Sequence, residues 1–253
     1  MHEILVINLP GALARRRLMQ AQLDVPGMPP HRFVDGVDGA ALDAEQRARL
    51  YDEIKARPIR GALTLPEIGC AASHRAAYRH VVERALPLAV VLEDDALLGV
   101  KFVDALGVVC SAMNPAVPQA VLLSHVVRYS AWGARKLDKI HRLCKPYEAF
   151  GAHGYVITLA GARAMLDALP RICTVADDWH YFASERIVSV SAVVPYVVGT
   201  SPFAALSGIG DERLKRVAGS PLQRWIRKYL WQKLLFQLVV KPALRLHRAE
   251  QTW

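Results

Sequence analysis

Several features that would indicate particular classes of protein are missing from this chain of 253 residues. Its four cysteines lie far apart and form no C-x-x-C pair, which argues against a zinc cluster or a redox dithiol. No stretch reaches the ~18 uncharged apolar residues that a membrane span needs. Internal repeats and low-complexity tracts are also missing, and a composition that is 53% hydrophobic and 22% charged excludes a disordered chain. The length suits one large domain or two small ones.

We also expect no secretory signal. The apolar stretch Glu3–Leu9 precedes the basic residues Arg15–Arg17, whereas a signal peptide has its basic residues first. Dispersed cysteines in a chain without a signal indicate reduced thiols. We therefore expect an intracellular protein.

The chain has little positive charge outside its C-terminal part. Of the net charge of +9, the stretch from Arg213 to Arg248 supplies ten bases and no acid, which leaves 22 bases and 23 acids elsewhere. Such a distribution argues against a nucleic-acid groove spread over the domain, and we expect no nucleic-acid partner. We divide the chain into a domain over 1–210 and a basic tail over 211–253.

The tail has the pattern of an amphipathic helix. Between Pro221 and Pro242, the apolar residues of the Leu222–Val240 segment, including Trp225, alternate with lysine and arginine. An apolar face with tryptophan and a basic face are typical of a helix that lies on an anionic membrane surface. The alternative is a helix that packs on the domain with its bases in water.

Strands and helices alternate over 1–210, which favours a layered α/β domain with a mostly parallel central sheet. We expect strands over 3–9, 31–37, 88–92, 119–127, 154–159 and 190–198. We expect helices over 12–23, 42–56, 67–85, 102–113 and 160–169. The stretches 57–65 and 128–147 lack a clean period and are predicted to be a loop and a long connection over the site.

One strand ends in a cluster of acids. Five apolar residues, Leu88–Leu92, are followed directly by Glu93, Asp94 and Asp95. Ligands of open α/β sheets bind beyond the carboxyl ends of strands, and three adjacent carboxylates repel one another unless a positive group lies among them. A hard divalent cation completed by phosphate oxygens would meet that need. The alternative is a solvated acidic turn.

The order of motifs resembles glycosyltransferase family 25, the lipooligosaccharide galactosyltransferase type. The motifs are ILVINL with an arginine cluster, EIGCAASH, VVLEDDA, GYVIT and ADDW, and they span about Glu3 to Gly199. The resemblance implies a single GT-A-like nucleotide-sugar-binding domain, an inverting reaction, and usually a divalent metal, Mn²⁺ or Mg²⁺.

In the resemblance, Glu93–Asp95 stands where such enzymes carry a D-x-D motif. We assign Asp95 to the metal, Glu93 to the metal or the donor ribose, and Asp94 to the donor site, as a ligand or as an acceptor that supports the ligands. A metal would neutralise the departing nucleoside diphosphate as a Lewis acid. The spacing assigns no third ligand among the histidines His125, His141, His153 and His180.

Two further segments are expected to bind the donor. Asn8, Leu9 and Arg15 begin the first strand–turn–helix unit, where uridine can bind and arginine can meet phosphate. Ser73 and His74 are adjacent in a helix and point about 100° apart, which disfavours a hydrolase dyad. The resemblance implies that they line the donor pocket; a buried, hydrogen-bonded pair is the alternative.

An inverting transfer needs a base that takes the proton of the acceptor hydroxyl. Asp177 and Asp178 form an acidic pair far along the chain from the metal site, and the resemblance favours one of them as this base. Trp179 is expected to offer a stacking surface for a sugar ring. The alternative is an acidic helix N-terminus.

The sequence thus predicts an inverting, metal-assisted glycosyltransferase that moves a sugar, with galactose from UDP-galactose as the best guess. The expected acceptor is a lipooligosaccharide or another lipid-linked surface glycan, and the expected location is cytoplasmic, peripheral on the inner face of the cell membrane. Two alternatives are a metal-dependent phosphohydrolase or phosphotransferase and a non-catalytic membrane-surface binding protein.

Overall fold

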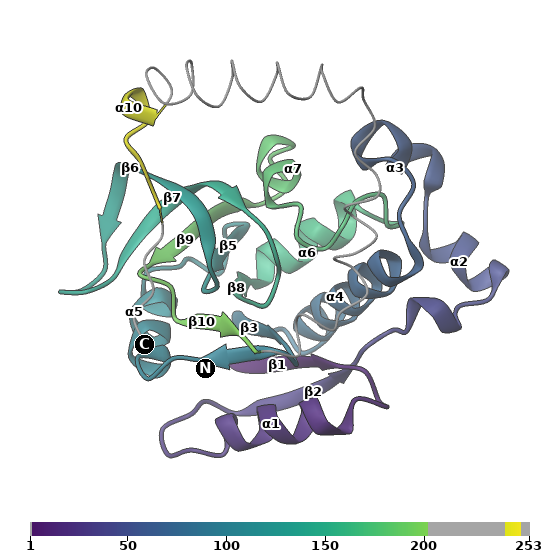
Figure 1. Ribbon diagram of the computed structural model, residues 1–253, viewed down its shortest axis with the longest axis horizontal. Coiled ribbons are helices and arrows are strands. Elements are labelled where there is room, and N and C mark those ends of the chain that lie inside the picture. The colour runs from purple at the N-terminus through teal and green to yellow at the C-terminus, as the bar shows by residue number, and fades with distance from the viewer. Residues whose placement is uncertain (1, 202–240, 249–253) are drawn as a thin grey trace.

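The computed structural model describes residues 2–201 and 241–248, and within these ranges the chain forms two sheets (Figure 1). The main sheet contains nine strands. Across the sheet their order is β11 (Leu246–Arg248), β6 (Val126–Lys136), β7 (Arg142–Ala149), β9 (Ser189–Val194), β5 (Gln119–Leu122), β8 (Gly154–Thr158), β3 (Leu88–Glu93), β1 (Glu3–Asn8) and β2 (His31–Asp35). The small sheet pairs β4 (Ala96–Leu98) with β10 (Val198–Thr200).

Helices cover both faces of the main sheet. They are α1 (Leu13–Leu23), the 3-10 helix η1 (Gly39–Ala41), α2 (Ala44–Leu50), α3 (Glu53–Arg60), α4 (Leu65–Glu83), α5 (Phe102–Ser111), α6 (Leu159–Ala168), α7 (Trp179–Ser184) and α10 (Lys241–Ala243). One apolar cluster includes residues of α4 and α6, and a second includes residues of α1 and α5. The predicted layered α/β class is therefore confirmed.

Strand β3 shows why its sequence is an unbroken apolar run. Ala89 and Val91 belong to the cluster under α4 and α6, whereas Leu88, Val90 and Leu92 belong to the cluster under α1 and α5. Successive side chains of a strand point to opposite faces, so burial on both faces demands apolar residues at every position. Each large side chain buried in this way contributes about 1.5–3 kcal/mol relative to exposure.

The prediction of a mostly parallel sheet is wrong. β1 runs parallel to β2 and β3, and β5 runs parallel to β9, but the other five pairings of the main sheet are antiparallel. β8 lies between β3 and β5 and runs against both. Parallel neighbours usually need a crossover helix, and no helix lies between β5 and β8 in the chain.

The stretch 128–147 is also not the long connection that was predicted. It forms most of β6 and β7, which pair as an antiparallel hairpin. The register shifts at three places along this pair, and most of β6 is only half-buried or exposed. Bulges of this kind break the period-2 pattern by which a strand is recognised.

The region between β2 and α4 is more helical than its sequence suggested. The helix expected over 42–56 is divided into α2 and α3 at Tyr51 and Asp52, because Asp52 caps α3 by accepting a hydrogen bond from Lys55 N. α3 continues to Arg60 and so takes up the first part of the predicted loop.

Part of the predicted tail joins the domain. Residues 246–248 form β11, which pairs with β6 at the edge of the main sheet. The predicted boundary at residue 210 and the amphipathic segment 222–240 lie outside the described residues. Among the helices of the described part, none has the length and apolar character needed to cross a membrane.

The start of α4 is fixed by close backbone contact. A Cβ at Gly69 would lie 2.5 Å from Gly39 N and 2.6 Å from Val37 O, so only glycine lets α4 approach η1 this closely. Thr64 and Glu67 form a capping box that satisfies the first turn of the helix. The first two turns of α4 are thereby held beside the segment that follows β2.

Candidate active site

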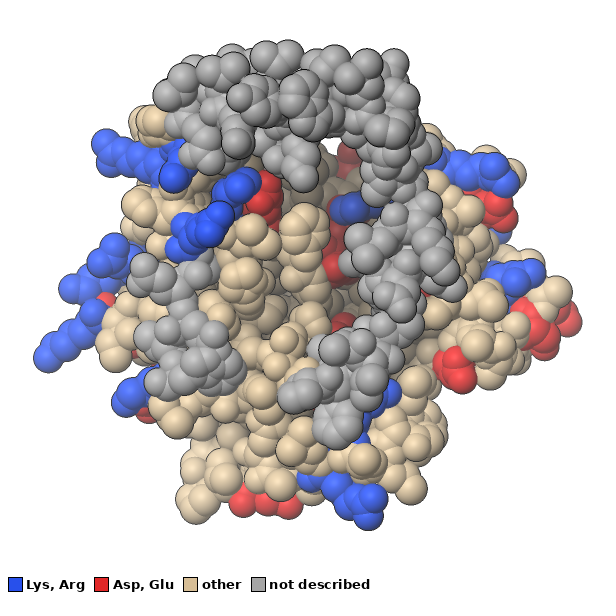
Figure 2. Space-filling model, viewed as in Figure 1, with Lys and Arg blue, Asp and Glu red and all other residues tan. Residues whose placement is uncertain are grey.

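A cavity of about 890 Å³ lies at the edge of the main sheet where β1, β2 and β3 end. This volume is within the range of small-molecule sites. Segments that are distant in the sequence line it: the β1–α1 turn, the residues after β2, the first turns of α4, the acids after β3, and the stretches 150–153 and 175–177. In the view of Figure 2, acidic side chains are visible near the middle of the face, while most visible Lys and Arg side chains lie toward its periphery.

Strand direction explains which side chains meet here. β1 and β3 are parallel, so Asn8 and Glu93 lie at the same edge of the sheet. β8 is antiparallel to β3, so its first residue lies at this edge too, and His153 directly precedes it. The backbone confirms this register, since Glu93 N donates to His153 O at 3.0 Å.

Asp94 turns toward β1 and α1. Its carboxylate accepts a hydrogen bond from Asn8 Nδ2 at 2.7 Å and pairs with the Arg15 guanidinium at 3.1 Å. Burial raises the pKa of Asp94, although Asn8 and Arg15 oppose that shift. Leu9 and Arg15 line the cavity, whereas Asn8 is buried behind Asp94 and orients it.

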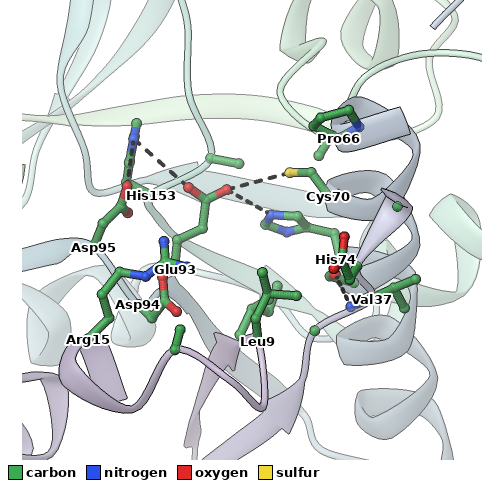
Figure 3. A pocket seen from close by; sticks show the side chains of 18 of the residues that line it. Leu9, Arg15, Val37, Pro66, Cys70, His74, Glu93, Asp94, Asp95 and His153 are labelled. Carbon is green, nitrogen blue, oxygen red and sulfur yellow. Dashed lines mark hydrogen bonds and ion pairs between the residues drawn. The ribbon is translucent and has the colours of Figure 1, made fainter. Parts of the chain in front are cut away.

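Glu93 and Asp95 turn the other way, toward His153 (Figure 3). His153 Nε2 lies 3.9 Å from Glu93 Oε2 and 4.0 Å from Asp95 Oδ2, and the ligand atoms of these three residues all lie within 4.8 Å of one another. Asp95 Oδ1 is buried and has no hydrogen-bond partner among the described residues. Burial and the neighbouring Glu93 raise the pKa of Asp95 to about 6.

These observations fit a divalent cation. A buried carboxylate oxygen without a donor is costly, and a bound cation would satisfy it. Two carboxylates are the oxygen ligands that Mn²⁺ and Mg²⁺ prefer when water and phosphate complete the shell, and an imidazole as third ligand favours Mn²⁺ over the harder Mg²⁺. His153 is thus the third candidate ligand that spacing could not identify, and Glu93 and Asp95 lie where they were predicted to meet.

His74 lies on the opposite side of Glu93. Its Nε2 is 3.1 Å from Glu93 Oε1 and its Nδ1 is 2.8 Å from the Tyr155 hydroxyl. Burial raises the pKa of Glu93, but the His74 hydrogen bond and the nearby His153 outweigh burial and lower it.

Ser73 accepts a hydrogen bond from Val37 N at 2.8 Å and donates to Gly69 O at 2.7 Å. Ser73 and His74 are thus the buried, hydrogen-bonded residues of the second alternative, and both also line the cavity, so their role in donor binding stays a prediction.

The structure separates Asp177 from Asp178. Asp177 lines the cavity, and its Oδ2 accepts a hydrogen bond from Gly151 N at 2.7 Å. Asp178 is not among the lining residues; it caps α7 and accepts hydrogen bonds from Arg60 and from Thr174 Oγ1. Burial raises the pKa of Asp178, but the Arg60 and Thr174 hydrogen bonds outweigh burial and lower it.

Trp179 does not form the stacking surface that was expected. Its side chain is 2% exposed and packs edge-on against Tyr155 and Phe182 in the core. Its Nε1 donates to Gly151 O at 3.0 Å, which holds the 150–153 stretch against the cavity. Phe150 is the aromatic residue that lines the cavity, and 59% of its surface is exposed.

Comparison with known proteins places these motifs in a family. Residues 1–180 match the family model described as "Glycosyltransferase family 25 (LPS biosynthesis protein)". The matched range contains α4, β3, His153 and Asp177.

Two curated relatives are procollagen galactosyltransferases. The chain is 26% identical over 246 residues to procollagen galactosyltransferase 2 of Homo sapiens, covering 91% of this chain and 36% of that protein. It is 29% identical over 178 residues to procollagen galactosyltransferase 1 of Danio rerio, covering 66% of this chain and 29% of that protein. The chain therefore spans about a third of the length of the curated relatives it matches.

Solved structures show a weaker likeness. A mannose-1-phosphate geranyltransferase from Thermus thermophilus aligns with a TM-score of 0.37 at 13% identity, covering 78% of this chain and 74% of that one. A glycosyltransferase involved in glycosylation of the major capsid of PBCV-1 aligns with a TM-score of 0.42 at 11% identity. The alignment covers 85% of this chain and 99% of that one. Both scores are too low to establish a shared fold.

Proposed function

The chain belongs to glycosyltransferase family 25, and from this premise we propose that it transfers a hexose from a nucleotide-sugar donor to a saccharide acceptor with inversion at the anomeric carbon. UDP-galactose is the first donor to test, because both curated relatives are named galactosyltransferases. The observation that carries the proposal is the convergence of Glu93, Asp95 and His153 on one wall of a cavity that Arg15 and Asp177 also line.

The donor diphosphate would lie against the β1–α1 turn. Arg15 lines the cavity there and is held by Asp94, which Asn8 holds in turn. A guanidinium oriented in this way can donate two parallel hydrogen bonds to phosphate oxygens. Leu9 adds an apolar surface at the same turn, where the nucleoside can pack.

Glu93, Asp95 and His153 would hold the divalent cation. When bound, such a cation supplies a Lewis acid that neutralises the charge of the departing nucleoside diphosphate. His74 keeps the Glu93 carboxylate oriented through its Nε2 hydrogen bond and so preorganises the cluster.

Asp177 is the proposed base. It lies on a chain segment separate from the carboxylates of β3 and faces the same cavity. In an inverting transfer the acceptor hydroxyl attacks from the face opposite the leaving group and gives its proton to a carboxylate. The Gly151 N–H bond to Oδ2 fixes the orientation of the side chain. Phe150, exposed beside it, offers the apolar face against which an acceptor sugar can stack.

The acceptor and the location remain part of the proposal. We infer a lipid-linked saccharide, with lipooligosaccharide as the first acceptor to test, and a place on the inner face of the cell membrane. The description of the matching family and the basic segment 222–240 support this inference.

The decisive experiment incubates the full chain with a panel of nucleotide sugars and Mn²⁺, with and without chelator, and measures both UDP release and the mass of the glycosylated product. We expect one UDP-hexose to be consumed, and chelation to stop its consumption. Asp95→Asn should lower the rate at least about a hundredfold, whereas the exposed Asp104→Asn in α5 should not. Release of inorganic phosphate without sugar transfer would instead show a phosphohydrolase.

A further inference from the structure

A second group of metal-binding side chains lies beside the first and includes a thiol. Cys70 and His74 are four residues apart on α4, so both face the same side of that helix, and that side faces the end of β3. The ligand atoms of Cys70, His74 and Glu93 all lie within 4.8 Å of one another. All three residues line the cavity, which gives a cation access to them.

The spacing of these atoms matches a tetrahedral zinc site. Glu93 Oε1 lies 3.1 Å from His74 Nε2 and 3.8 Å from Cys70 Sγ. With zinc bonds of about 2.3 Å to sulfur and about 2.0 Å to nitrogen and oxygen, tetrahedral ligands lie about 3.3–3.5 Å apart. The two separations from Glu93 Oε1 are therefore within a few tenths of an ångström of those in a zinc site, and Cys70 Sγ and His74 Nε2 lie within 4.8 Å of each other.

Tyr155 already orients the histidine for this role. The Tyr155 hydroxyl lies 2.8 Å from His74 Nδ1 and 2.9 Å from the Tyr78 hydroxyl, and both tyrosines are buried. Ligating histidines usually donate the N–H of their second nitrogen to a fixed partner, which selects the tautomer and the ring orientation. With the N–H of Nδ1 facing Tyr155, Zn²⁺ at Nε2 would replace the hydrogen bond that this nitrogen makes to Glu93 Oε1. Figure 3 shows this side of the ring facing Glu93 and Cys70.

The two donor sets differ in chemistry and share one residue. Oε2 of Glu93 faces Asp95 and His153, whereas Oε1 faces His74 and Cys70. The first set has two carboxylates, which suit hard cations, and one borderline imidazole, whereas the thiolate of the second set selects softer ions such as Zn²⁺. We propose that Cys70, His74 and Glu93 form a distinct Zn²⁺ site, in which the Cys70 thiol loses its proton and the ion binds Sγ, Nε2 and Oε1.

This site has a consequence for the cavity as a whole. Zn²⁺ at Cys70 and His74 draws the Glu93 carboxylate toward α4 and places a second positive charge beside the Asp95–His153 cluster. Zn²⁺ therefore weakens the hold of the first cluster on its own cation, and it inhibits a reaction that Mn²⁺ supports.

Titration of the full chain with Co²⁺, a spectroscopic substitute for Zn²⁺, tests the site without any assay of activity. A thiolate ligand gives cobalt an intense near-ultraviolet charge-transfer absorption that oxygen and nitrogen ligands do not give. We expect this band in the wild type and in Cys110→Ala, whose thiol is buried in α5, and expect Zn²⁺ to abolish it by displacement. Cys70→Ala should lack the band, and its Zn²⁺ affinity should fall more than about a hundredfold.

Two further variants separate the proposed site from the first cluster. His153→Ala should keep the cobalt band, because His153 is not a ligand of this site, and Tyr155→Phe should lower Zn²⁺ affinity about tenfold. A wild type without the band, or a band unchanged in Cys70→Ala, would overturn the proposal. Loss of the band in His153→Ala would overturn it too, since the two sets would then be one site. None of these readouts depends on sugar transfer, so failure of the proposed function would leave them interpretable.

Discussion

Asp177 and Asp178 are neighbours in the sequence, but their surroundings give them different properties. Asp177 faces the cavity with one oxygen fixed by a backbone N–H, whereas Asp178 is enclosed by Arg60, Thr174 and the first turn of α7. The sequence could identify the pair but could not choose between its members, because the choice depends on which side chain faces the cavity.

Asp177→Asn tests the role of base. The variant cannot accept the proton of the acceptor hydroxyl, so kcat for sugar transfer should fall about a hundredfold to ten-thousandfold. Donor KM and the unfolding midpoint should stay close to wild type, because the amide oxygen can still accept the Gly151 hydrogen bond. Steady-state kinetics at saturating donor measure both quantities, and an unchanged kcat would remove Asp177 from the mechanism.

Asp178→Asn should instead lower stability. The buried carboxylate loses its charge beside Arg60, and the free energy of unfolding at neutral pH should fall by about 1–3 kcal/mol. The lower part of this range is the better expectation, since the Arg60 side chain is 43% exposed and water screens the pair. Urea unfolding of both proteins measures the difference.

The ion pair between Asp178 and Arg60 also predicts that the stability of the protein depends on pH. The pKa of Asp178 is lower in the folded protein than in the unfolded chain, so its contribution to stability is present above the unfolded pKa of about 4. That contribution is lost as the pH falls through the folded pKa. The stability difference between wild type and Asp178→Asn should therefore be constant from pH 7 to about pH 5 and shrink below about pH 4. A difference that grows toward acid pH would contradict the assignment.

His153 shows what residue patterns could not supply. The acids of the cluster follow an unmistakable buried strand, and their position at a strand end was predicted. His153 precedes β8, and in a parallel sheet that position would lie at the opposite edge from Glu93. Only the antiparallel direction of β8 brings the histidine to the acids, and strand direction depends on long-range pairing that no local pattern records.

At the scale of elements, the strands buried on both faces were recognisable and the hairpin was not. β1, β3 and β8 have unbroken apolar runs because helices cover both faces of the sheet there. β6 and β7 lie toward the other end of the sheet, where side chains are half-exposed and the register shifts. Their polar and aromatic sequence therefore carries neither of the periods from which strands are predicted.

The contact between α4 and η1 makes a prediction about glycine. Gly69→Ala would place a methyl group against Val37 O and Gly39 N, so α4 must move away from η1. The free energy of unfolding should fall by about 2 kcal/mol or more, although alanine favours helix by about 1 kcal/mol. Because Ser73 binds both Val37 N and Gly69 O, the move should also loosen that wall of the cavity.

Gly107→Ala in α5 is the matched control. A Cβ there meets no atom within 4 Å, and the residue is exposed in the interior of a helix. This variant should gain about 0.5–1 kcal/mol through helix propensity alone. Thermal or urea unfolding of the two variants compares them directly, and a Gly69→Ala protein as stable as Gly107→Ala would contradict the close approach.

At the scale of the whole molecule, the basic segment is attached at both ends to the domain. Ser201 N donates to Asp95 O at 2.8 Å, so the chain leaves the described part beside the candidate cation cluster. It returns through α10 to β11, which is paired with β6. If residues 222–240 bind a membrane, as proposed, these two connections tether the domain to the lipid surface.

Vesicle binding by the full chain tests that arrangement. Each base near an anionic surface contributes about 1 kcal/mol, so neutralising four of them to glutamine should weaken binding to anionic vesicles at least about a hundredfold. The four bases are Arg224, Arg227, Lys228 and Lys233. Sedimentation with anionic vesicles, and with neutral vesicles in parallel, measures the fraction of each protein that is bound to lipid.

The controls separate this contact from the general charge of the protein. Neutralising Arg47 and Arg49, which are exposed in α2, should leave binding nearly unchanged, because these bases lie outside the amphipathic segment. Binding should also weaken as salt rises, since the Debye length falls from about 10 Å at 0.1 M to about 3 Å at 1 M. Transfer to a soluble saccharide acceptor should persist in the fourfold variant, whereas transfer to the same acceptor in anionic vesicles should drop with the bound fraction. Equal loss with both acceptors would place the four bases in catalysis or folding instead of membrane attachment.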